Sequence, residues 1–400
     1  MKRRDLIKTA ISIPVVAGLS GCNSTPYEIA DDEELRIEPK QTKPYEFSIA
    51  LPFNFETIDG LYELNQKYKK SKIVTLYNSM FSPFTKNYDC CMHRTDFHAF
   101  QKTNANTLDD FKKYAKYAMD KGFKICYLLN ATKPMSKSDF NSFKKEFHTL
   151  LDFLANTGIN EIKVANTQTA TLVNEYNPNF KLSASTAFEF HSIAQYKNLI
   201  QSYPNMELVD VAIDENYNFR FLNNLKKMYP NLKVEVMINE GCDKGCPARI
   251  SHNCTEYARF NCYLLKKPIY LKYVKDNFVY PWFLPYYQQI GVNNFKCLCY
   301  PNGRNNFHDL SYFNNYLKIV EFGYDSIEAD TLFNKAMWEG YKVINKKIMV
   351  KDIIRYLPDI KHIIKHGYKC AYECGTECQY CDNQARKLEK AIEQLSKIYS

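Results

Sequence analysis

The stretch LDDFKKYAKYAMDKGFKICYLL, residues 108–129, shows the two kinds of element that decide the fold. Residues 108–121 alternate apolar and charged side chains at helical spacing and predict an amphipathic helix. Residues 123–129 form a short apolar run and predict a buried strand. The same order, a helical stretch followed by a short strand, recurs along most of the chain.

Eight short runs of this kind predict strands, at residues 47–51, 72–77, 123–129, 161–165, 180–184, 208–213, 232–238 and 293–297. Between them, helical stretches include residues 57–70, 108–121, 137–156, 189–202 and 217–228. Eight strands with intervening helices favour an α/β fold of the (β/α)8 TIM-barrel type, with an open doubly wound sheet as the alternative. The insertion between the seventh and eighth strands contains a group of cysteines.

Polar residues and cysteines follow the predicted strands at their carboxyl ends. They are Asn54, Asn78, Asn130, Asn166, Ser185, Asp214, Asn239, Glu240, Cys242, Cys297 and Cys299. In a barrel these positions share one rim, where barrel enzymes place their chemistry. A single asparagine at such a position is more readily explained as a cap of a strand or helix. Asp214, Glu240 and the cysteines are therefore the stronger functional candidates.

Two groups of cysteines have the spacing of metal ligands. The first comprises Cys242, Cys246, Cys254 and Cys262, and the second, in the tail, comprises Cys370, Cys374, Cys378 and Cys381. Short spacers let several thiolates converge on zinc or an iron-sulfur cluster. Disulfides are the alternative for the tail group. The tail also has the cysteine spacing of a radical S-adenosylmethionine motif, in which three cysteines leave one iron open for the cofactor. Here the motif lies beyond the barrel, and Cys370 would supply a fourth ligand to that iron.

The first 22 residues predict export. Arg3 and Arg4 precede an apolar run too short to span a membrane, which is typical of a twin-arginine signal. Residues 19–22 resemble a lipobox, so Cys22 would carry a lipid and tether the mature chain to a membrane of the cell envelope, facing the periplasm. An uncleaved amphipathic start on a cytoplasmic protein is the alternative.

The remaining sequence divides into a linker, a barrel and a tail. Residues 23–44 lack an apolar period and predict a linker, residues 45–365 the barrel, and residues 366–400 the cysteine-rich tail with a C-terminal helix. The formal net charge of +9 is spread without a long basic block, so no nucleic-acid partner is expected. With 45% hydrophobic residues, the chain can bury one large core.

Three segments resemble the collagenase-like peptidases, U-type peptidase family 32. They are VEVMINEGCDKGCPARISHN at 234–253, GVNNFK at 291–296 and NGR at 302–304. The resemblance covers roughly residues 45–325. It implies a barrel whose mid-chain cysteines hold a four-iron four-sulfur cluster. The family is linked to oxygen-independent hydroxylation of ubiquinone precursors and of tRNA uridine, and historically to collagen degradation.

The chain departs from the family pattern in two places. The gap between Cys242 and Cys246 is shorter than usual, and a cysteine expected shortly before the eighth strand is missing. Cys297 or Cys299 is the candidate replacement. The closest branch is the iron-sulfur, hydroxylase-related one with a cysteine-rich tail.

These considerations give a set of candidate site residues. Metal ligands are expected among Cys242, Cys246, Cys254, Cys262, Cys297, Cys299, Cys370, Cys374, Cys378 and Cys381, with zinc as the alternative at the tail. Proton transfer is expected from Asp214, Glu240 or His252, and Arg249 and Arg304 would contact the cofactor or substrate. Cys90 or Cys91 could reach the mid-chain cluster, whereas Cys126 is expected in the core. We expect the tail cysteines to form a separate, closed centre.

The predicted function is that of a redox or oxygen-independent hydroxylation-type enzyme acting on an organic substrate. A non-catalytic, membrane-tethered metalloprotein, either an electron carrier or a binding module, is the alternative. Peptidase activity is less favoured, because no Ser, Cys-His or zinc-water arrangement has the spacing that peptide hydrolysis requires.

Overall fold

The computed structural model describes residues 35, 37–79, 107–130, 137–239, 245, 278–297, 310–330, 344–345, 347–370 and 377–399. The chain divides into two compact units, Met1–Leu35 and Arg36–Ser400. All of the described helices and strands belong to the second unit. The predicted signal and lipobox lie outside the described residues, so export and lipid attachment stay predictions, as do the predicted domain limits.

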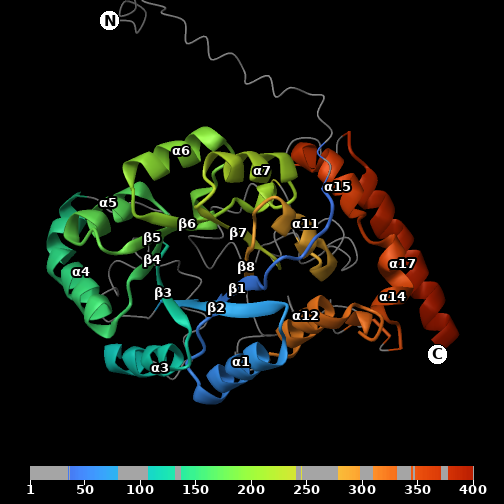
Figure 1. The fold of residues 1–400 in the computed structure, drawn as a ribbon, viewed down its shortest axis with the longest axis horizontal. Coiled ribbons are helices and arrows are strands. Elements are labelled where there is room, and N and C mark those ends of the chain that lie inside the picture. Colours follow the sequence, from blue (N-terminus) through green and yellow to red (C-terminus); the bar gives the residue numbers. More distant parts are fainter. Residues whose placement is uncertain are drawn as a thin grey trace, which may run out of the picture. The chain divides into compact units, whose positions relative to one another are not determined.

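Eight parallel strands close into a barrel in the order of the sequence (Figure 1). They are β1 (Tyr45–Ala50), β2 (Ser71–Asn78), β3 (Lys124–Leu129), β4 (Glu161–Val164), β5 (Lys181–Ala184), β6 (Met206–Asp210), β7 (Lys233–Met237) and β8 (Asn294–Cys297). The barrel closes where β1 pairs with β8, from Glu46 opposite Asn294 to Ile49 opposite Cys297. This closure confirms the predicted (β/α)8 fold and excludes the open sheet.

Helices follow the strands and surround them (Figure 1). They are α1 (Phe55–Lys67), α3 (Leu108–Asp120), α4 (Lys137–Thr157), α5 (Thr167–Tyr176), α6 (Ile193–Ser202), α7 (Phe219–Met228), α11 (Leu284–Gln289) and α12 (Ser311–Phe322). Asparagines cap the N-termini of α1 and α5, because the side chains of Asn54 and Asn166 each accept a backbone N–H at 2.8 Å. The capping interpretation is therefore confirmed for both residues.

Among the predicted elements whose limits differ in the structure, two bear on the rim of the barrel. The sixth strand ends at Asp210 rather than at residue 213, because Ile213–Glu215 turns into a 3-10 helix, η4. Helix α6 begins at Ile193 rather than at residue 189, because a second 3-10 helix, η3 (Thr186–Phe188), follows β5. Both differences place residues expected in regular elements on the rim of the barrel instead.

Side chains alternate between the inside of the barrel and its helical layer. On β1, Phe47 packs on the rings of Phe313 and Tyr316 of α12, at centroid distances of 5.5 and 6.1 Å. The next residue, Ser48, bonds to Glu235 of β7. Because successive side chains of a strand point to opposite faces, the apolar positions face the helices and the polar ones face the interior.

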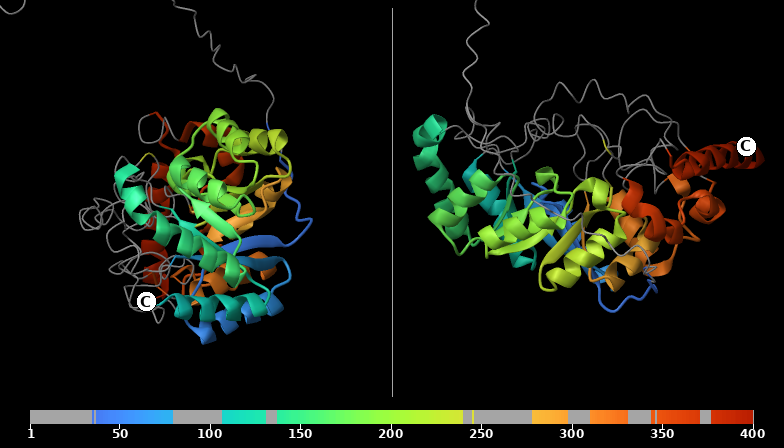
Figure 2. Two further views of the ribbon diagram at one scale, coloured as in Figure 1. Left: turned by 90° about the vertical axis from the view of Figure 1, so that its left-hand side faces the viewer. Right: turned by 90° about the horizontal axis from the view of Figure 1, so that it is seen from above.

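The C-terminal part continues past the barrel as α14 (Val350–Ile353), η8 (Ile354–Tyr356), α15 (Ile360–His366), η9 (Gly367–Lys369) and α17 (Tyr380–Tyr399), whose helices lie beside one another in Figure 2. Helix α17 buries an apolar stripe formed by Ala385, Leu388, Ala391 and Ile392. At its start, the Tyr380 ring stacks on His362 of α15 at 3.6 Å. The stripe is thus covered by the segment that precedes it.

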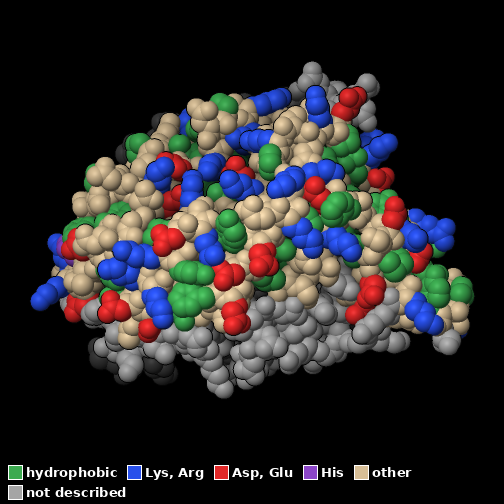
Figure 3. All heavy atoms as spheres, turned by 60° about the horizontal axis from the view of Figure 1, so that its bottom comes forward, with side chains coloured by type: hydrophobic (Ala, Val, Ile, Leu, Met, Phe, Trp, Pro, Cys, Tyr) green, Lys and Arg blue, Asp and Glu red, His purple; other side chains and the backbone are tan. Residues whose placement is uncertain are grey.

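The described surface carries charges of both signs. On the face shown in Figure 3, Lys and Arg side chains are interspersed with Asp and Glu rather than gathered in one patch. Within the described residues, none of the helices combines the length and the apolar character that crossing a bilayer requires.

Candidate functional site

Four charged side chains meet inside the barrel. Lys163 of β4 forms an ion pair with Asp210 of β6, and its Nζ lies 2.8 Å from Oε2 of Glu235 on β7. Nζ of Lys296 on β8 lies 2.9 Å from the other oxygen of Asp210. The Ser48 hydroxyl donates to Oε1 of Glu235 at 2.5 Å. All five residues are buried, so this network links five strands of the barrel.

The network shifts the pKa values of its members. Burial alone would raise the pKa of Asp210, but Lys163 and Lys296 outweigh burial and hold that pKa well below its usual range. Burial dominates at Glu235, whose pKa is raised, and at Lys296, whose pKa is lowered. Asp210 is therefore the firmly ionised carboxylate, and Glu235 is the one that takes up a proton more readily.

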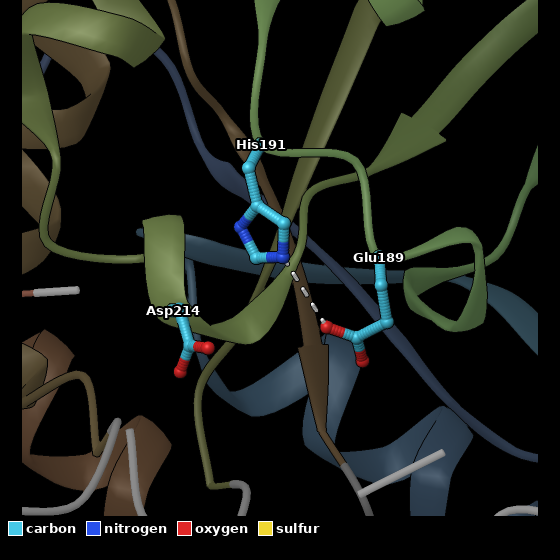
Figure 4. Close-up of side chains that lie close together, drawn as sticks. All are labelled: Glu189, His191 and Asp214. Atoms are coloured by element: carbon cyan, nitrogen blue, oxygen red, sulfur yellow. Dashed lines mark ion pairs between the residues drawn. The ribbon is translucent and has the colours of Figure 1, made fainter. Parts of the chain in front are cut away.

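A second group of titratable side chains lies after β5 and β6, at the carboxyl-end rim. Glu189 and His191 follow β5, and Asp214 lies in η4 after β6 (Figure 4). One ligand atom from each of the three lies within 4.8 Å of the others. Within the described part of the chain, this is the one group of three or more His, Cys, Asp or Glu residues that meets this condition.

Local structure fixes the two segments. His191 N–H donates to Oε1 of Gln195, whose side chain also closes the capping box of α6. Glu189 has a φ of +48°, a left-handed conformation that costs a non-glycine residue roughly 1–2 kcal/mol. After β6, the Asn216 side chain donates to the carbonyl of Met237 on β7 at 2.8 Å. Both rim segments are therefore anchored to neighbouring elements of the barrel.

Electrostatics favour a proton on His191. Its Nδ1 lies 3.1 Å from Oε1 of Glu215, a side chain that is 2% exposed. The hydrogen bond to Glu215 raises the pKa of His191 above its ordinary value, against the opposing effect of burial. Asp214 is also buried, and its Oδ1 accepts the backbone N–H of Gly245 at 3.0 Å. Gly245 lies between Cys242 and Cys246 in the sequence.

The C-terminal segment reaches the same rim. A Cβ placed on Gly367 would lie 2.0 Å from the carbonyl oxygen of Tyr217, so these two backbones are in close contact. Arg220 lies over the ring of Tyr368, 4.5 Å from its centroid. Burial raises the pKa of Tyr217 well above its usual range, and the nearby thiols of Cys381 and Cys370 contribute to the increase. Cys370 and Cys381 therefore lie near Tyr217, at the end of the turn formed by residues 213–217.

Of the predicted catalytic residues, the structure describes only Asp214, which lies on the rim. The other predicted site residues outside the described part of the chain are Cys22, Cys90, Cys91, Glu240, Cys242, Cys246, Arg249, His252, Cys254, Cys262, Cys299, Arg304 and Cys374. Their roles stay predictions.

The described cysteines occupy different environments. Cys126 is buried in β3, as predicted, and burial raises the pKa of its thiol to about 12. Cys297, at the end of β8, is buried near Tyr316 of α12. Cys370, Cys378 and Cys381 are half-buried, and their three sulfurs do not all lie within 4.8 Å of one another.

Sequence reasoning missed Glu189, His191 and the charged network inside the barrel. The predicted helix at residues 189–202 includes Glu189 and His191, although both residues follow the end of the predicted strand at residues 180–184. Lys163, Asp210, Glu235 and Lys296 each interrupt an apolar strand, and four charges within buried strands were the signal that could have identified the network.

Comparison with known proteins identifies the central part of this barrel. The sequence model of peptidase family U32 matches residues 94–239. This part of the chain belongs to peptidase family U32. The predicted family is thereby confirmed, and the matched U32 segment includes Lys163, Asp210 and the whole group of Glu189, His191 and Asp214.

Solved structures similar to this chain include the U32 peptidase Mk0906, with 10% identity, a TM-score of 0.45, and coverage of 66% of this chain and 96% of that chain. Another is the endo-β-1,4-mannanase from Thermotoga petrophila, with 11% identity, a TM-score of 0.39, and coverage of 72% of this chain and 79% of that chain. A third is the trehalose-6-phosphate hydrolase of Bacillus licheniformis, with 9% identity, a TM-score of 0.38, and coverage of 84% of each chain. A search of curated proteins gave no match.

Proposed function

We propose that this chain is an iron-sulfur redox enzyme of the oxygen-independent hydroxylation type, acting on an organic substrate at the carboxyl-end rim of the barrel. The observation that carries the proposal is the position of the turn at residues 213–217. Asp214 in this turn binds Gly245 of the mid-chain cysteine segment, and Tyr217 lies near Cys370 and Cys381 of the tail. One short turn thus contacts both cysteine-bearing segments.

Thiolates suit both an iron-sulfur cluster and zinc, so the donor atoms of the tail do not choose between the two. The resemblance to the iron-sulfur branch of the family favours iron, with zinc as the alternative at the tail.

The proposed ligands are the cysteines of two segments. Cys242, Cys246 and Cys262, with Cys254, Cys297 or Cys299 as a fourth partner, would hold the mid-chain centre. Cys370, Cys374, Cys378 and Cys381 would hold a tail centre. When bound, such clusters supply electron transfer at the rim.

The chain's own residues would bind the substrate and handle its protons. Asp214 is buried and oriented by Gly245, so its carboxylate is the described candidate for proton transfer. Glu240 and His252 are the further candidates, and Arg249 and Arg304 would contact the cofactor or substrate. Beneath the rim, the ion pairs of Lys163, Asp210, Glu235 and Lys296 hold the strands that carry these segments.

The proposal includes export and lipid attachment at Cys22, which would place the enzyme at a membrane of the cell envelope. Twin-arginine export carries folded proteins with their cofactors already inserted. A folded barrel with bound clusters is therefore consistent with the Arg3-Arg4 signal.

Anaerobic purification followed by spectroscopy tests the proposal. We expect iron and acid-labile sulfide in the protein and a reducible cluster in its electron paramagnetic resonance spectrum. A reduction potential that shifts when a small organic ligand binds supports an enzyme, whereas a potential that no ligand shifts favours an electron carrier. Protein that contains neither iron nor sulfide, and that cannot be reconstituted with them, would contradict the proposal.

A further inference from the structure

We propose that Glu189, His191 and Asp214 bind one divalent transition-metal ion, at a site separate from the cysteine centres. The three side chains come from two rim segments, one after β5 and one after β6, and they converge in Figure 4. Their ligand atoms all lie within 4.8 Å of one another. One imidazole and two carboxylates form a mixed nitrogen and oxygen donor set that suits Zn²⁺ or Mn²⁺.

The separations are close to those of a bound ion. Nε2 of His191 lies 3.8 Å from Oε2 of Glu189. Atoms bound to one ion at about 2.1 Å stand roughly 3.0–4.2 Å apart, depending on the geometry. In a tetrahedral site all three separations would be ~3.4 Å; the His191–Glu189 separation of 3.8 Å is about 0.4 Å wider, and the widest of the group, at most 4.8 Å, is about 1.4 Å wider. Rotation of a carboxylate side chain covers such a difference.

The surroundings of His191 match those of a metal-binding histidine. Such histidines commonly donate their second ring N–H to a carboxylate, which orients the ring and makes the other nitrogen a better ligand. Glu215 occupies that place, because its Oε1 lies 3.1 Å from Nδ1 of His191. Oε2 of Glu215 accepts the side-chain N–H of Asn218 at 2.7 Å, which fixes the carboxylate in turn. His191 therefore directs Nε2 toward Glu189.

Asp214 is also held in place for this role. Its Oδ1 accepts the Gly245 N–H at 3.0 Å, which orients the carboxylate. The His191 side chain is 38% exposed, so an ion can reach the group from solvent. A bound ion would join the rim segments after β5 and β6 and offer a coordination position to an oxygen atom of the substrate.

The site does not depend on the proposed iron-sulfur function. Thiolates are soft ligands, whereas this group offers harder oxygen and nitrogen atoms. With an ion bound, Asp214 is a ligand, and proton transfer passes to other groups. His191→Gln should therefore leave the iron and sulfide content unchanged, so failure of this site can be told apart from failure of the proposed function.

Titration of the chelator-treated full chain with Mn²⁺ tests the proposal, with free Mn²⁺ followed by electron paramagnetic resonance. Mn²⁺ is the probe because it prefers oxygen ligands to the thiolates elsewhere in the chain. We expect one ion per chain. His191→Gln and Asp214→Asn should each raise the Kd at least tenfold, whereas Glu175→Gln, an exposed carboxylate on α5, and Cys370→Ala should not.

Circular dichroism checks that each variant is folded. His191 lies in a partly exposed loop, so its replacement should not prevent folding. If Asp214→Asn does not fold, the Mn²⁺ Kd of His191→Gln alone is compared with that of the wild type. Absence of saturable Mn²⁺ binding to the wild-type chain would overturn the proposal. An unchanged Kd in folded His191→Gln would overturn it as well.

Discussion

Lys163 on β4 and Asp210 on β6 form an ion pair inside the barrel, two strands apart. Lys296 and Glu235 complete the network, so two cations face two carboxylates in a buried space. Barrels of this type are usually filled by branched apolar side chains. Here the interior is held by charge pairs, which makes it sensitive to the loss of any single member.

Replacement of Lys163 by Met should destabilise the fold by about 3–5 kcal/mol, because the change leaves Asp210 and Glu235 buried without their shared cation. Urea unfolding measures the loss. The matched control is Lys181→Met, which removes a lysine whose side chain is 41% exposed and paired with Glu207. That pair is screened by solvent and should cost less than about 1 kcal/mol. Equal losses of unfolding free energy in the two variants would show that the buried network stabilises the fold no more than an exposed ion pair does.

Gly367→Ala should detach the tail from the rim. A methyl group there would lie 2.0 Å from the Tyr217 carbonyl oxygen, so one backbone must move, at a cost of ~1–3 kcal/mol. Limited trypsin digestion should then cleave residues 377–399 faster than in the wild type. Gly158→Ala is the control: its φ of +88° makes alanine unfavourable, but no atom lies within 4 Å. Faster tail cleavage in both variants alike would argue against a specific contact at Tyr217.

The barrel could be predicted from sequence because its signals are local. Short apolar runs such as residues 123–129 alternate with amphipathic stretches, and each predicted strand overlaps an observed one. The family could be recognised from residues 234–253, and Asp214 could be placed on the rim from its position after a strand. Capping roles for Asn54 and Asn166 followed from their positions as well.

The candidate metal site and the interior network could not be predicted, because both depend on contacts distant in sequence. His191 and Asp214 are joined only when β5 and β6 lie side by side. Lys163 and Glu235 meet only across a closed barrel. The approach of Cys370 to Tyr217 likewise depends on how the chain after the barrel returns to its rim.

Acidic pH should loosen α17. Burial lowers the pKa of His362, whose ring stacks on Tyr380 between the charges of Asp359 and His366. The docked state therefore prefers neutral His362, and its stability is lost as pH falls below the ordinary histidine value of about 6.5. Amide protection of α17, corrected for intrinsic exchange rates, should fall between pH 7.5 and 5.5. His362→Phe keeps the stacking and should flatten this dependence; a variant that responds to pH as strongly as the wild type would rule out His362 as the cause.

Cys22→Ser should abolish lipid attachment and release the mature chain from membrane fractions, because the lipobox cysteine is the modified residue. Metabolic labelling with a fatty-acid probe measures this. The matched control is Cys126→Ser, which alters a buried cysteine of the barrel. Undiminished label in Cys22→Ser would refute the anchor.

The iron content of anaerobically purified Cys370→Ala and Cys381→Ala, compared with Cys126→Ala, tests the central claim most directly. All three changes remove one thiol, but only the first two thiols lie near the rim turn at Tyr217. Each tail variant should lose the iron and sulfide of the tail centre and keep those of the mid-chain centre, while Cys126→Ala keeps both. Full iron in both tail variants, or the same loss in all three, would contradict the account.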